Sequence, residues 1–488
     1  MQIFSNKIDN AAFKKAIRTQ KKFIRKFGDD RNTEYHLTLA DNNVLTPPFG
    51  CKVIQTSEAS DFTQQLPSKP VIIGNIRMGF GHYRISMAMA SAARALGYTP
   101  LWMDLNSFPE TTCTKIISYQ NSLYSKGSRF SQQANPVSSL FNKLIWEPLN
   151  YEGFKKLTYN AGDQVTAQLM TPLFREIPKD IPFIATHVWP SQAAVHAGMK
   201  NVINAIPDNW PMALHLSEGA VHTVQTYNSY WGYRTLNGFD SKKILNPMNK
   251  DDIVFTGHYI DHELVSNIEK DCAARIERAK NGEPVRFLFT IGGAGAQGDF
   301  FASMINTLLP YVKQNKACLY INCGDYQNVW TKLCTVIPEL KNGIVKTTEH
   351  FDNWEEELAF ANNALSSTCT GIHAFCNKDI FAAVYITNLL MRASDILITK
   401  PSELAFYPVP KLFIRRVGGH EMWGAIHSAE LGDGTQECTT PQQADAVIKM
   451  IMEDTSLIEL MCRNIINEKV KGTYDGAYNV IKIGEQRV

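Results

Sequence analysis

The sequence predicts an α/β protein made of two doubly wound, Rossmann-like domains that face each other across a cleft, preceded by a basic amphipathic helix. From residue 70 onward, short apolar runs of strand length alternate with segments of helix length. Two of these runs enter glycine-rich turns, at 78–82 and 292–298, and a helical pattern follows each turn. The 488 residues, 44% of them hydrophobic, suffice for two or three domains at about 100–200 residues each.

Composition excludes several classes of protein. Forty-nine lysines and arginines against 47 acidic residues give a formal net charge of +2, so nothing points to nucleic acid as a partner. No stretch of about 20 predominantly apolar residues predicts a membrane span, and the first ten residues do not resemble a secretory signal. Ten scattered cysteines without a CxxC pair indicate a reducing compartment, and no ligand spacing indicates a metal site. We therefore expect a cytoplasmic protein.

Residues 11–27 predict a basic amphipathic helix. Its apolar side chains recur at helical spacing, and lysines and arginines fill the other positions. Such a helix either packs on the body of its own protein or lies on an anionic membrane surface, and both interpretations stay open. We assign residues 1–65, which include this helix, to an N-terminal extension.

The first α/β half is expected over residues 66–260. It opens with the β-branched run PVIIGNI at 70–76, followed by the glycine turn, a helix at 83–97 and a strand at 99–105. Further apolar runs predict strands at 182–188, 202–207, 222–227 and 252–257.

The second half is expected over 261–440, with C-terminal helices at 441–488. Its strands are predicted at 284–293, 317–324, 343–348, 395–401 and 410–416. In open α/β sheets, ligands bind beyond the carboxyl ends of the strands, so the cleft between the halves is the expected site.

The glycine turn of the second half matches GxGxxG at Gly293, Gly295 and Gly298. Glycines between a strand and a helix let backbone N–H groups approach a phosphate. A dinucleotide site requires an acidic residue about 20 positions after the glycine turn, where it binds the ribose hydroxyls. Asp325 lies well beyond that spacing. The diphosphate of a nucleotide sugar is the competing interpretation, and tight packing of the strand on the helix is the purely structural one.

Two carboxylates follow the last two predicted strands. Glu403 comes after the strand at 395–401, and Glu421 follows the strand at 410–416 in the sequence GGHE. Parallel strands end on one rim, so both carboxylates are expected beside the glycine turn. A carboxylate there is suited to accept hydrogen bonds from sugar or ribose hydroxyls.

Six short motifs follow one another along the chain: GFGH with RISMA at 79–88, IPD at 206–208, FTG at 255–257, GGAG at 292–295, RASDILITKP at 392–401 and GHE at 419–421. In this order they resemble motifs of the GT-B glycosyltransferases of the MurG and monogalactosyldiacylglycerol synthase type. The resemblance implies the GT-B fold, and an enzyme that moves a sugar from a nucleotide sugar to a hydroxyl acceptor.

The resemblance also implies roles in the first half. His82 would act as the general base or orient the acceptor, since an imidazole titrates near neutral pH. Asp208 is the alternative base, and Gly79, Gly81 and Trp210 would lie on the acceptor side.

In the second half the resemblance implies a donor site. Three glycines would hold the diphosphate, an aromatic ring would stack on the base, and polar side chains would bind the ribose and the transferred sugar. In that order these residues are Gly292, Gly293 and Gly295, then Phe375, then Ser402 with Glu403, and finally His420 with Glu421. A core role for Phe375 is an equal alternative. The segment after Pro401 is also shorter than in the family, which bears on the ribose role.

We therefore expect a metal-independent, inverting glycosyltransferase with a UDP-sugar as donor. The nucleotide sugar is a substrate, and no cofactor is expected. If the basic helix contacts a membrane, we expect a lipid acceptor and a location at the inner face of that membrane. Two alternatives stay open. One is a nucleotide-sugar 2-epimerase, which needs several acid/base residues around one sugar. The other is a catalytically inert GT-B protein that binds carbohydrate or nucleotide.

Overall fold

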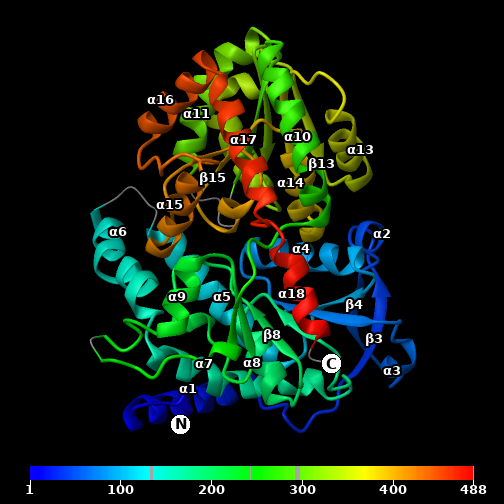
Figure 1. Cartoon of the computed structure of the whole chain (residues 1–488), viewed down its shortest axis with the longest axis vertical. Coiled ribbons are helices and arrows are strands. Elements are labelled where there is room, and N and C mark those ends of the chain that lie inside the picture. The colour runs from blue at the N-terminus through cyan, green and yellow to red at the C-terminus, as the bar shows by residue number, and fades with distance from the viewer. Residues whose placement is uncertain (132–135, 242, 292–296, 487–488) are drawn as a thin grey trace. The chain divides into compact units, whose positions relative to one another are not determined.

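The chain folds into two compact α/β units (Figure 1). The computed structural model describes residues 1–131, 136–241, 243–291 and 297–486, without the side chains of residues 128 and 129. The first unit comprises residues 1–262 and 475–488, and the second unit comprises 263–474.

Within the described residues, the main sheet of the first unit has eight strands in the order β10-β9-β8-β7-β5-β6-β4-β3. They are β3 (His36–Asp41), β4 (Lys52–Ser57), β5 (Pro70–Asn75), β6 (Thr99–Asp104), β7 (Phe183–Ala185), β8 (Val202–Ala205), β9 (Val221–Val224) and β10 (Ile253–Phe255). Neighbouring strands are parallel, except that β3 is antiparallel to β4. The chain leaves β5 toward β6 on one side and returns to β7 on the other, so β5 and β7 flank the topological switch point.

The helices of the first unit cover this sheet. They are α1 (Asn10–Phe27), α2 (Thr46–Phe49), α3 (Phe62–Gln65), α4 (Gly81–Ala95), α5 (Thr112–Ser131), α6 (Pro136–Phe141), α7 (Leu157–Ala167), α8 (Val188–His196), α9 (Tyr227–Thr235) and α18 (Gly476–Glu485). A short hairpin of β1 (Gln2–Ile3) and β2 (Asn6–Lys7) precedes α1. The Asp9 side chain accepts a hydrogen bond from the Ala11 N–H at 2.7 Å and so caps α1.

The C-terminal helix α18 returns to the first unit and packs against α4. Val480 and Ile481 share a core with Ile85 of α4 and Ile73 of β5. A Cβ atom on Gly476 would lie 2.1 Å from the carbonyl oxygen of Gly257, so only glycine allows this close approach of the returning chain.

The second unit has an all-parallel sheet. Within the described residues its six strands run in the order β13-β14-β12-β11-β15-β16. They are β11 (Val285–Thr290), β12 (Ala317–Asn322), β13 (Thr347–Phe351), β14 (Gly371–Cys376), β15 (Ile396–Thr399) and β16 (Lys411–Phe413). Their order reverses between β11 and β15, which is the switch point of this unit.

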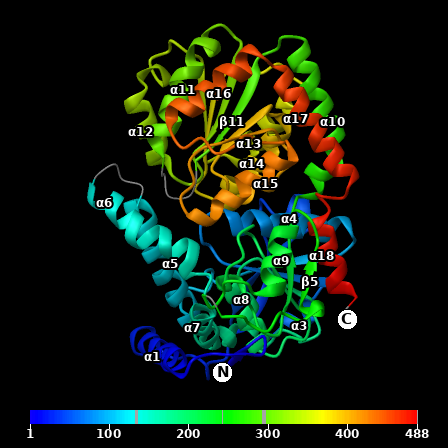
Figure 2. The same ribbon diagram turned by 60° about the vertical axis from the view of Figure 1, so that its left-hand side comes forward.

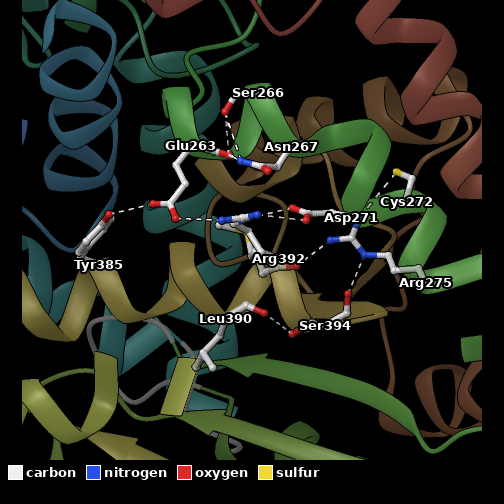
Figure 3. A network of polar contacts seen from close by, with 11 residues as sticks. Glu263, Ser266, Asn267, Asp271, Cys272, Arg275, Tyr385, Leu390, Arg392 and Ser394 are labelled. Atoms are coloured by element: carbon white, nitrogen blue, oxygen red, sulfur yellow. Dashed lines mark hydrogen bonds and ion pairs between the residues drawn. The ribbon is translucent and has the colours of Figure 1, made fainter. Parts of the chain in front are cut away.

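Helices flank the second sheet. They are α10 (His262–Lys280), α11 (Gly298–Lys313), α12 (Gln327–Val336), α13 (Trp354–Ala364), α14 (Ile380–Ala393), α15 (Met422–Leu431), α16 (Pro441–Glu453) and α17 (Ser456–Val470). Arg392 of α14 forms ion pairs with Glu263 and Asp271 of α10, at 2.9 and 3.0 Å (Figure 3). These contacts fasten α10 to α14 within the unit.

The α/β prediction with two Rossmann-like halves is confirmed by the two sheets. The arrangement of the two halves across a cleft stays a prediction. The division of the chain differs from the predicted one at both ends. Residues 1–65 contribute β3 and β4 to the main sheet and so are no separate extension, and residues 441–488 divide between the units, because α18 packs on α4.

The basic helix 11–27 is α1, and of its two interpretations the structure shows the packed one. Ala16, Gln20 and Phe23 are buried, and the Gln20 side chain donates to the Val165 carbonyl of α7 at 2.6 Å. The apolar face of α1 is therefore covered by the protein itself. Within the described residues, no helix combines the length and apolarity that a membrane crossing needs.

Candidate functional site

His82 lies at the switch point of the first unit. It stands in the first turn of α4, directly after the glycine turn that follows β5. Its Nδ1 lies 2.7 Å from the carbonyl oxygen of Thr186, which follows β7. A carbonyl oxygen only accepts, so Nδ1 carries the hydrogen, and in the neutral ring Nε2 is the basic nitrogen. The imidazole is therefore held in the tautomer that a general base needs.

A second histidine packs against His82. The ring of His187 meets the ring of His82 edge to face, with centroids 4.7 Å apart and an interplanar angle of 85°. Nδ1 of His187 accepts a hydrogen bond from the Trp189 N–H at 3.2 Å and caps α8. Burial first, and then the charges of His82 and His215, lower the pKa of His187 well below its usual value. His187 is thus a neutral neighbour of His82.

Asp208 and His215 form a pair beyond the end of β8. Oδ2 of Asp208 lies 2.9 Å from Nε2 of His215. The imidazole is almost fully buried, whereas a quarter of the Asp208 side chain is exposed. The Asn204 side chain donates to the carbonyl oxygen of His215 at 2.5 Å and holds its backbone. This pair orients a partly exposed carboxylate on the edge of the sheet that carries His82.

The three acceptor-side residues have different surroundings. Gly79 has a φ of +71°, a backbone conformation that favours glycine in the turn before α4, and Gly81 is the first residue of that helix. The indole of Trp210 stacks on Tyr151 with centroids 4.4 Å apart and donates to the Tyr151 carbonyl at 2.9 Å. Lys155 lies 4.3 Å from the Trp210 ring centre. Trp210 is thus held in place by its own unit, and its contact with an acceptor stays a prediction.

Asp104 is a further carboxyl group on this edge that the sequence analysis missed. It ends β6, next to β5, and its carboxylate accepts hydrogen bonds from the Tyr83 hydroxyl and from the Asn106 N–H. Burial raises the pKa of Asp104 to about 6, although these hydrogen bonds oppose the rise. Asp104 and His187 share one signal in the sequence. Each is a polar residue at or just after the end of a buried apolar run.

The predicted phosphate turn of the second unit lies outside the described residues. This holds for Gly292, Gly293 and Gly295, which fall in the segment 292–296. On either side, β11 ends at Thr290 and α11 begins at Gly298. A central strand of the sheet and a helix of 16 residues thus flank this segment.

The ends of β15 and β16 meet at one rim of the second sheet. Lys400, which follows β15, forms an ion pair with Glu421, which follows β16. The other Glu421 oxygen accepts hydrogen bonds from the N–H groups of Val417 and Gly418 at 2.7 and 3.3 Å. Burial alone would raise the pKa of Glu421, but the charges of Lys400 and His420 and these hydrogen bonds outweigh it, and the pKa lies below its usual value.

This geometry corrects the predicted role of Glu421. Its side chain is only 6% exposed, and both oxygens are engaged within the unit. The carboxylate therefore joins two strand ends and is not placed to bind a transferred sugar. His420 beside it is half-buried, and its Nδ1 is buried without a hydrogen-bond partner.

Ser402 and Glu403 are partly exposed on the same rim. Glu403 begins a single turn of 3-10 helix that ends at Phe406, so the segment is short, as its prolines suggest. A Cβ atom on Gly424 of α15 would lie 2.8 Å from the carbonyl oxygen of Pro401, which shows how closely α15 packs on this turn. A ribose contact by Glu403 stays a prediction.

Phe375 does not occupy a site for a base. It lies in β14 with no exposed surface. Its ring stacks on His350, with centroids 4.8 Å apart and an interplanar angle of 12°, and it also packs against Phe360. The alternative role as a core residue is the one that the structure shows.

Metal ligands do not gather in the part of the chain that the structure describes. No group of three or more histidine, cysteine, aspartate or glutamate residues there is arranged to hold an ion. Each of the ten cysteines is a free thiol. The two strand-end edges present imidazoles, carboxylates, a lysine and backbone N–H groups.

Two family models match the chain one after the other, and the second extends beyond the second unit at both ends. Residues 2–235 match a family model described as Domain of unknown function (DUF6937), and residues 248–485 match Domain of unknown function (DUF6938). No protein of curated function matches the chain in sequence.

Several solved structures are similar over 86% of this chain. The UDP-GlcNAc 2-epimerase from Neisseria meningitidis bound to UDP-GlcNAc is 14% identical, with 98% of its chain covered and a TM-score of 0.44. WaaG, a glycosyltransferase involved in lipopolysaccharide biosynthesis, is 13% identical, with 100% of its chain covered and a TM-score of 0.41. At such values, the fold of this protein rests on its own two sheets and their strand order.

Proposed function

We propose that this protein is a glycosyltransferase that moves a sugar from a nucleotide-sugar donor to a hydroxyl acceptor. The observation that carries the proposal is the hydrogen bond from His82 Nδ1 to the Thr186 carbonyl at the switch point. It makes Nε2 the basic nitrogen at the edge of an α/β sheet where ligands bind. The order of the six motifs along the chain supports the same function.

The expected reaction is a single displacement. The acceptor hydroxyl loses its proton to His82 Nε2, and its oxygen forms a bond to the anomeric carbon of the donor. The bond from that carbon to the diphosphate oxygen breaks, and its electron pair leaves with the nucleoside diphosphate. Asp208, oriented by His215, is the alternative base. The N–H groups and dipole at the start of α11 would stabilise the leaving diphosphate without a metal ion.

The resemblance to GT-B enzymes favours a UDP-sugar as donor. We assign the donor to the second unit, through its glycine turn and Glu403, and the acceptor to the first unit. A lipid acceptor at the inner face of a membrane remains part of this proposal.

One observation favours a second function, a nucleotide-sugar 2-epimerase. That chemistry needs several acid/base groups around one sugar. The first unit brings together His82 with His187, and both Asp208 and His215 lie beyond the neighbouring strand β8. The crowding of these groups is what the 2-epimerase reaction requires.

A binding panel tests the proposal. Thermal unfolding is followed with UDP, GDP, CDP, several UDP-sugars and NAD, since a ligand at a hundredfold excess over Kd adds about 2.7 kcal/mol of stability. We expect a shift with one nucleoside diphosphate and its sugar that is lost in Glu403→Ala and kept in the control Glu430→Ala. A response to NAD alone would contradict the proposal.

Turnover of the bound donor then separates the two functions. Release of the nucleoside diphosphate that requires a hydroxyl acceptor identifies the transferase. Conversion of the sugar to its C2 epimer without an acceptor, with uptake of deuterium from D2O at C2, identifies the epimerase. Binding without any turnover would indicate an inert binding protein.

A further inference from the structure

A helical arm of the first unit exposes a set of aliphatic side chains. It runs along the second half of α5 and continues, on the far side of residues 132–135, through α6 and two π-helical turns, η1 (Asn142–Trp146) and η2 (Leu149–Gly153). Six large apolar side chains of this arm are between 38% and 68% exposed: Leu123, Val137, Leu140, Leu144, Ile145 and Leu149. We call these six residues the apolar patch.

Contacts between aromatic side chains hold α6 and η1 against α5. Trp146 packs against Tyr124 of α5, with ring centroids 5.1 Å apart, and Phe141 packs against Phe130 at 5.1 Å. A Cβ atom on Gly127 would lie 2.5 Å from the Trp146 ring, so glycine lets the indole close onto α5. The aromatic side chains thus face inward, and the aliphatic ones stay on the surface of the arm. Exposed apolar patches of this kind mark interaction sites.

Positive charge is concentrated beside the apolar patch. Residues 112–156 hold six lysines and arginines against two acidic residues, and residues 10–27 hold seven against none. The whole chain has 49 against 47, so the remainder of the chain is net negative. The excess of positive charge thus lies mainly in α1, while the arm itself, over residues 122–153, holds three lysines and arginines against two acidic residues.

Helix α1 and the arm belong to one side of the first unit. Phe23 and Phe27 of α1 pack against Tyr119 of α5, and the ammonium of Lys26 lies 3.5 Å from the Tyr119 ring centre. Figure 2 shows α5 leading from α1 toward α6 along one flank of this unit. The apolar face of α1 is buried against the protein, so α1 would contact a partner through its charged side chains.

We propose that the apolar patch inserts into an anionic membrane, while the lysines of α1 and the arm bind its headgroups. Aliphatic side chains gain from leaving water for the acyl region, and basic residues are attracted to anionic lipids. A second copy of the chain fits this surface less well, because a two-fold contact would place one cationic surface against its equivalent. An amphipathic helix carries its apolar face and its charges on one element. Here the apolar contact lies on the arm, and most of the charge lies on α1.

This inference deepens the proposed function, because a membrane contact by the acceptor-side unit fits an acceptor that resides in the bilayer. It rests on exposure, packing and charge, however, and its test does not require turnover. Donor binding and membrane binding are measured separately, so each can fail alone.

Co-sedimentation with vesicles tests the proposal, using phosphatidylcholine with and without phosphatidylglycerol, at low and high salt. We expect the full chain to bind the anionic vesicles and not the neutral ones. Leu140→Gln with Leu144→Gln should lower this affinity about tenfold or more. The matched control, Ile344→Gln with Leu460→Gln, removes two exposed apolar residues of the second unit and should leave the affinity unchanged. Lys21→Gln with Lys22→Gln should weaken binding mainly at low salt.

Three results would overturn the proposal. They are no binding of the wild-type chain to anionic vesicles, equal losses in the arm and control variants, and a wild-type dimer that the arm variant dissociates in sedimentation velocity. Each variant is also tested for thermal stability and for the nucleotide-induced shift, which the arm variant should keep. A wild-type chain that does not bind anionic vesicles but responds to nucleotide contradicts the membrane proposal alone. A wild-type chain that binds the vesicles but responds to no nucleotide contradicts the proposed function alone.

Discussion

His215 holds the carboxylate of Asp208 through a contact of 2.9 Å between its Nε2 and Oδ2 of the acid. The imidazole is buried, and the carboxylate reaches the surface at the carboxyl edge of the sheet. An isolated surface aspartate would sample several rotamers, and the buried partner restricts this one. His215 is therefore a positioning residue for whichever role Asp208 has.

A double-mutant cycle should reveal this coupling. Asp208→Asn and His215→Gln each remove one partner, so the double variant should lose less than the sum of the single losses. Residues in direct contact typically couple by about 0.5–3 kcal/mol, and we expect that range for the free energy of unfolding. Turnover should follow the same non-additive pattern, and its pH profile should change in His215→Gln. Pairing Asp208→Asn with His196→Gln is the control, and an additive result in both cycles would contradict the coupling.

His82→Gln should remove turnover while leaving nucleotide binding intact. A positioned general base contributes about 10²–10⁴-fold, and glutamine cannot accept the proton. The control is His196→Gln, since His196 makes a similar hydrogen bond from a ring nitrogen to a carbonyl, 2.9 Å from Gln164, near the end of α8. Unchanged turnover in His82→Gln would move the base to Asp208.

Much of the fold follows from local sequence patterns. Buried parallel strands such as β5 and β11 read as short β-branched runs, and glycine turns mark where a helix follows. Local patterns do not predict strands whose side chains are partly polar or only partly buried. β13 begins four residues after the predicted position, because this edge strand is polar and only partly buried, and β14 was not predicted because its run contains a histidine and a cysteine.

The candidate site was predictable only in part. His82 and Asp208 follow recognisable strand ends, so their positions along the chain identify them. The partners His187 and His215 depend on the order of strands in the sheet, which no local pattern contains. The sequence left the role of Phe375 open between a ligand and the core, and it did not indicate the pairing of Glu421 with Lys400. Burial by distant segments decides both.

Lys400→Gln should destabilise the second unit. The substitution leaves the buried carboxylate of Glu421 with backbone donors only, and loss of one partner from a buried pair costs about 3–5 kcal/mol at full burial. Because Lys400 itself is 27% exposed, we expect a smaller loss of about 2 kcal/mol. Lys378→Gln, which removes the exposed partner of Asp352, should cost much less than Lys400→Gln, because an exposed ion pair contributes little to stability. Denaturant unfolding measures both, and equal losses would argue against a structural role for the Lys400–Glu421 pair.

Arg392→Gln should have a larger effect. Its guanidinium is the shared partner of Glu263 and Asp271 (Figure 3), and Asp271 is buried. An unpaired buried carboxylate predicts a loss of about 3–5 kcal/mol in the free energy of unfolding. Arg463→Gln is the matched control, because the Arg463 side chain is 65% exposed and pairs with Glu459 one helical turn away, so its loss should change stability far less than Arg392→Gln. A loss in Arg392→Gln no greater than in the control would show that α10 and α14 do not depend on this network.

Asp163 should make the first unit less stable as pH rises. Burial raises the pKa of this carboxyl on α7 to about 7, above its ordinary value of 3.8. The folded state therefore binds the proton more tightly than the unfolded state, so the contribution of Asp163 to stability falls between about pH 4 and 7 and stays constant above. Asp163→Asn keeps the shape of the neutral acid and removes this dependence, so the variant should gain in melting temperature over the wild type across that range. Asp180→Asn, at an exposed carboxylate paired with Lys200, is the control. A difference between Asp163→Asn and the wild type that does not grow with pH would mean that the folded state holds this carboxyl ionised.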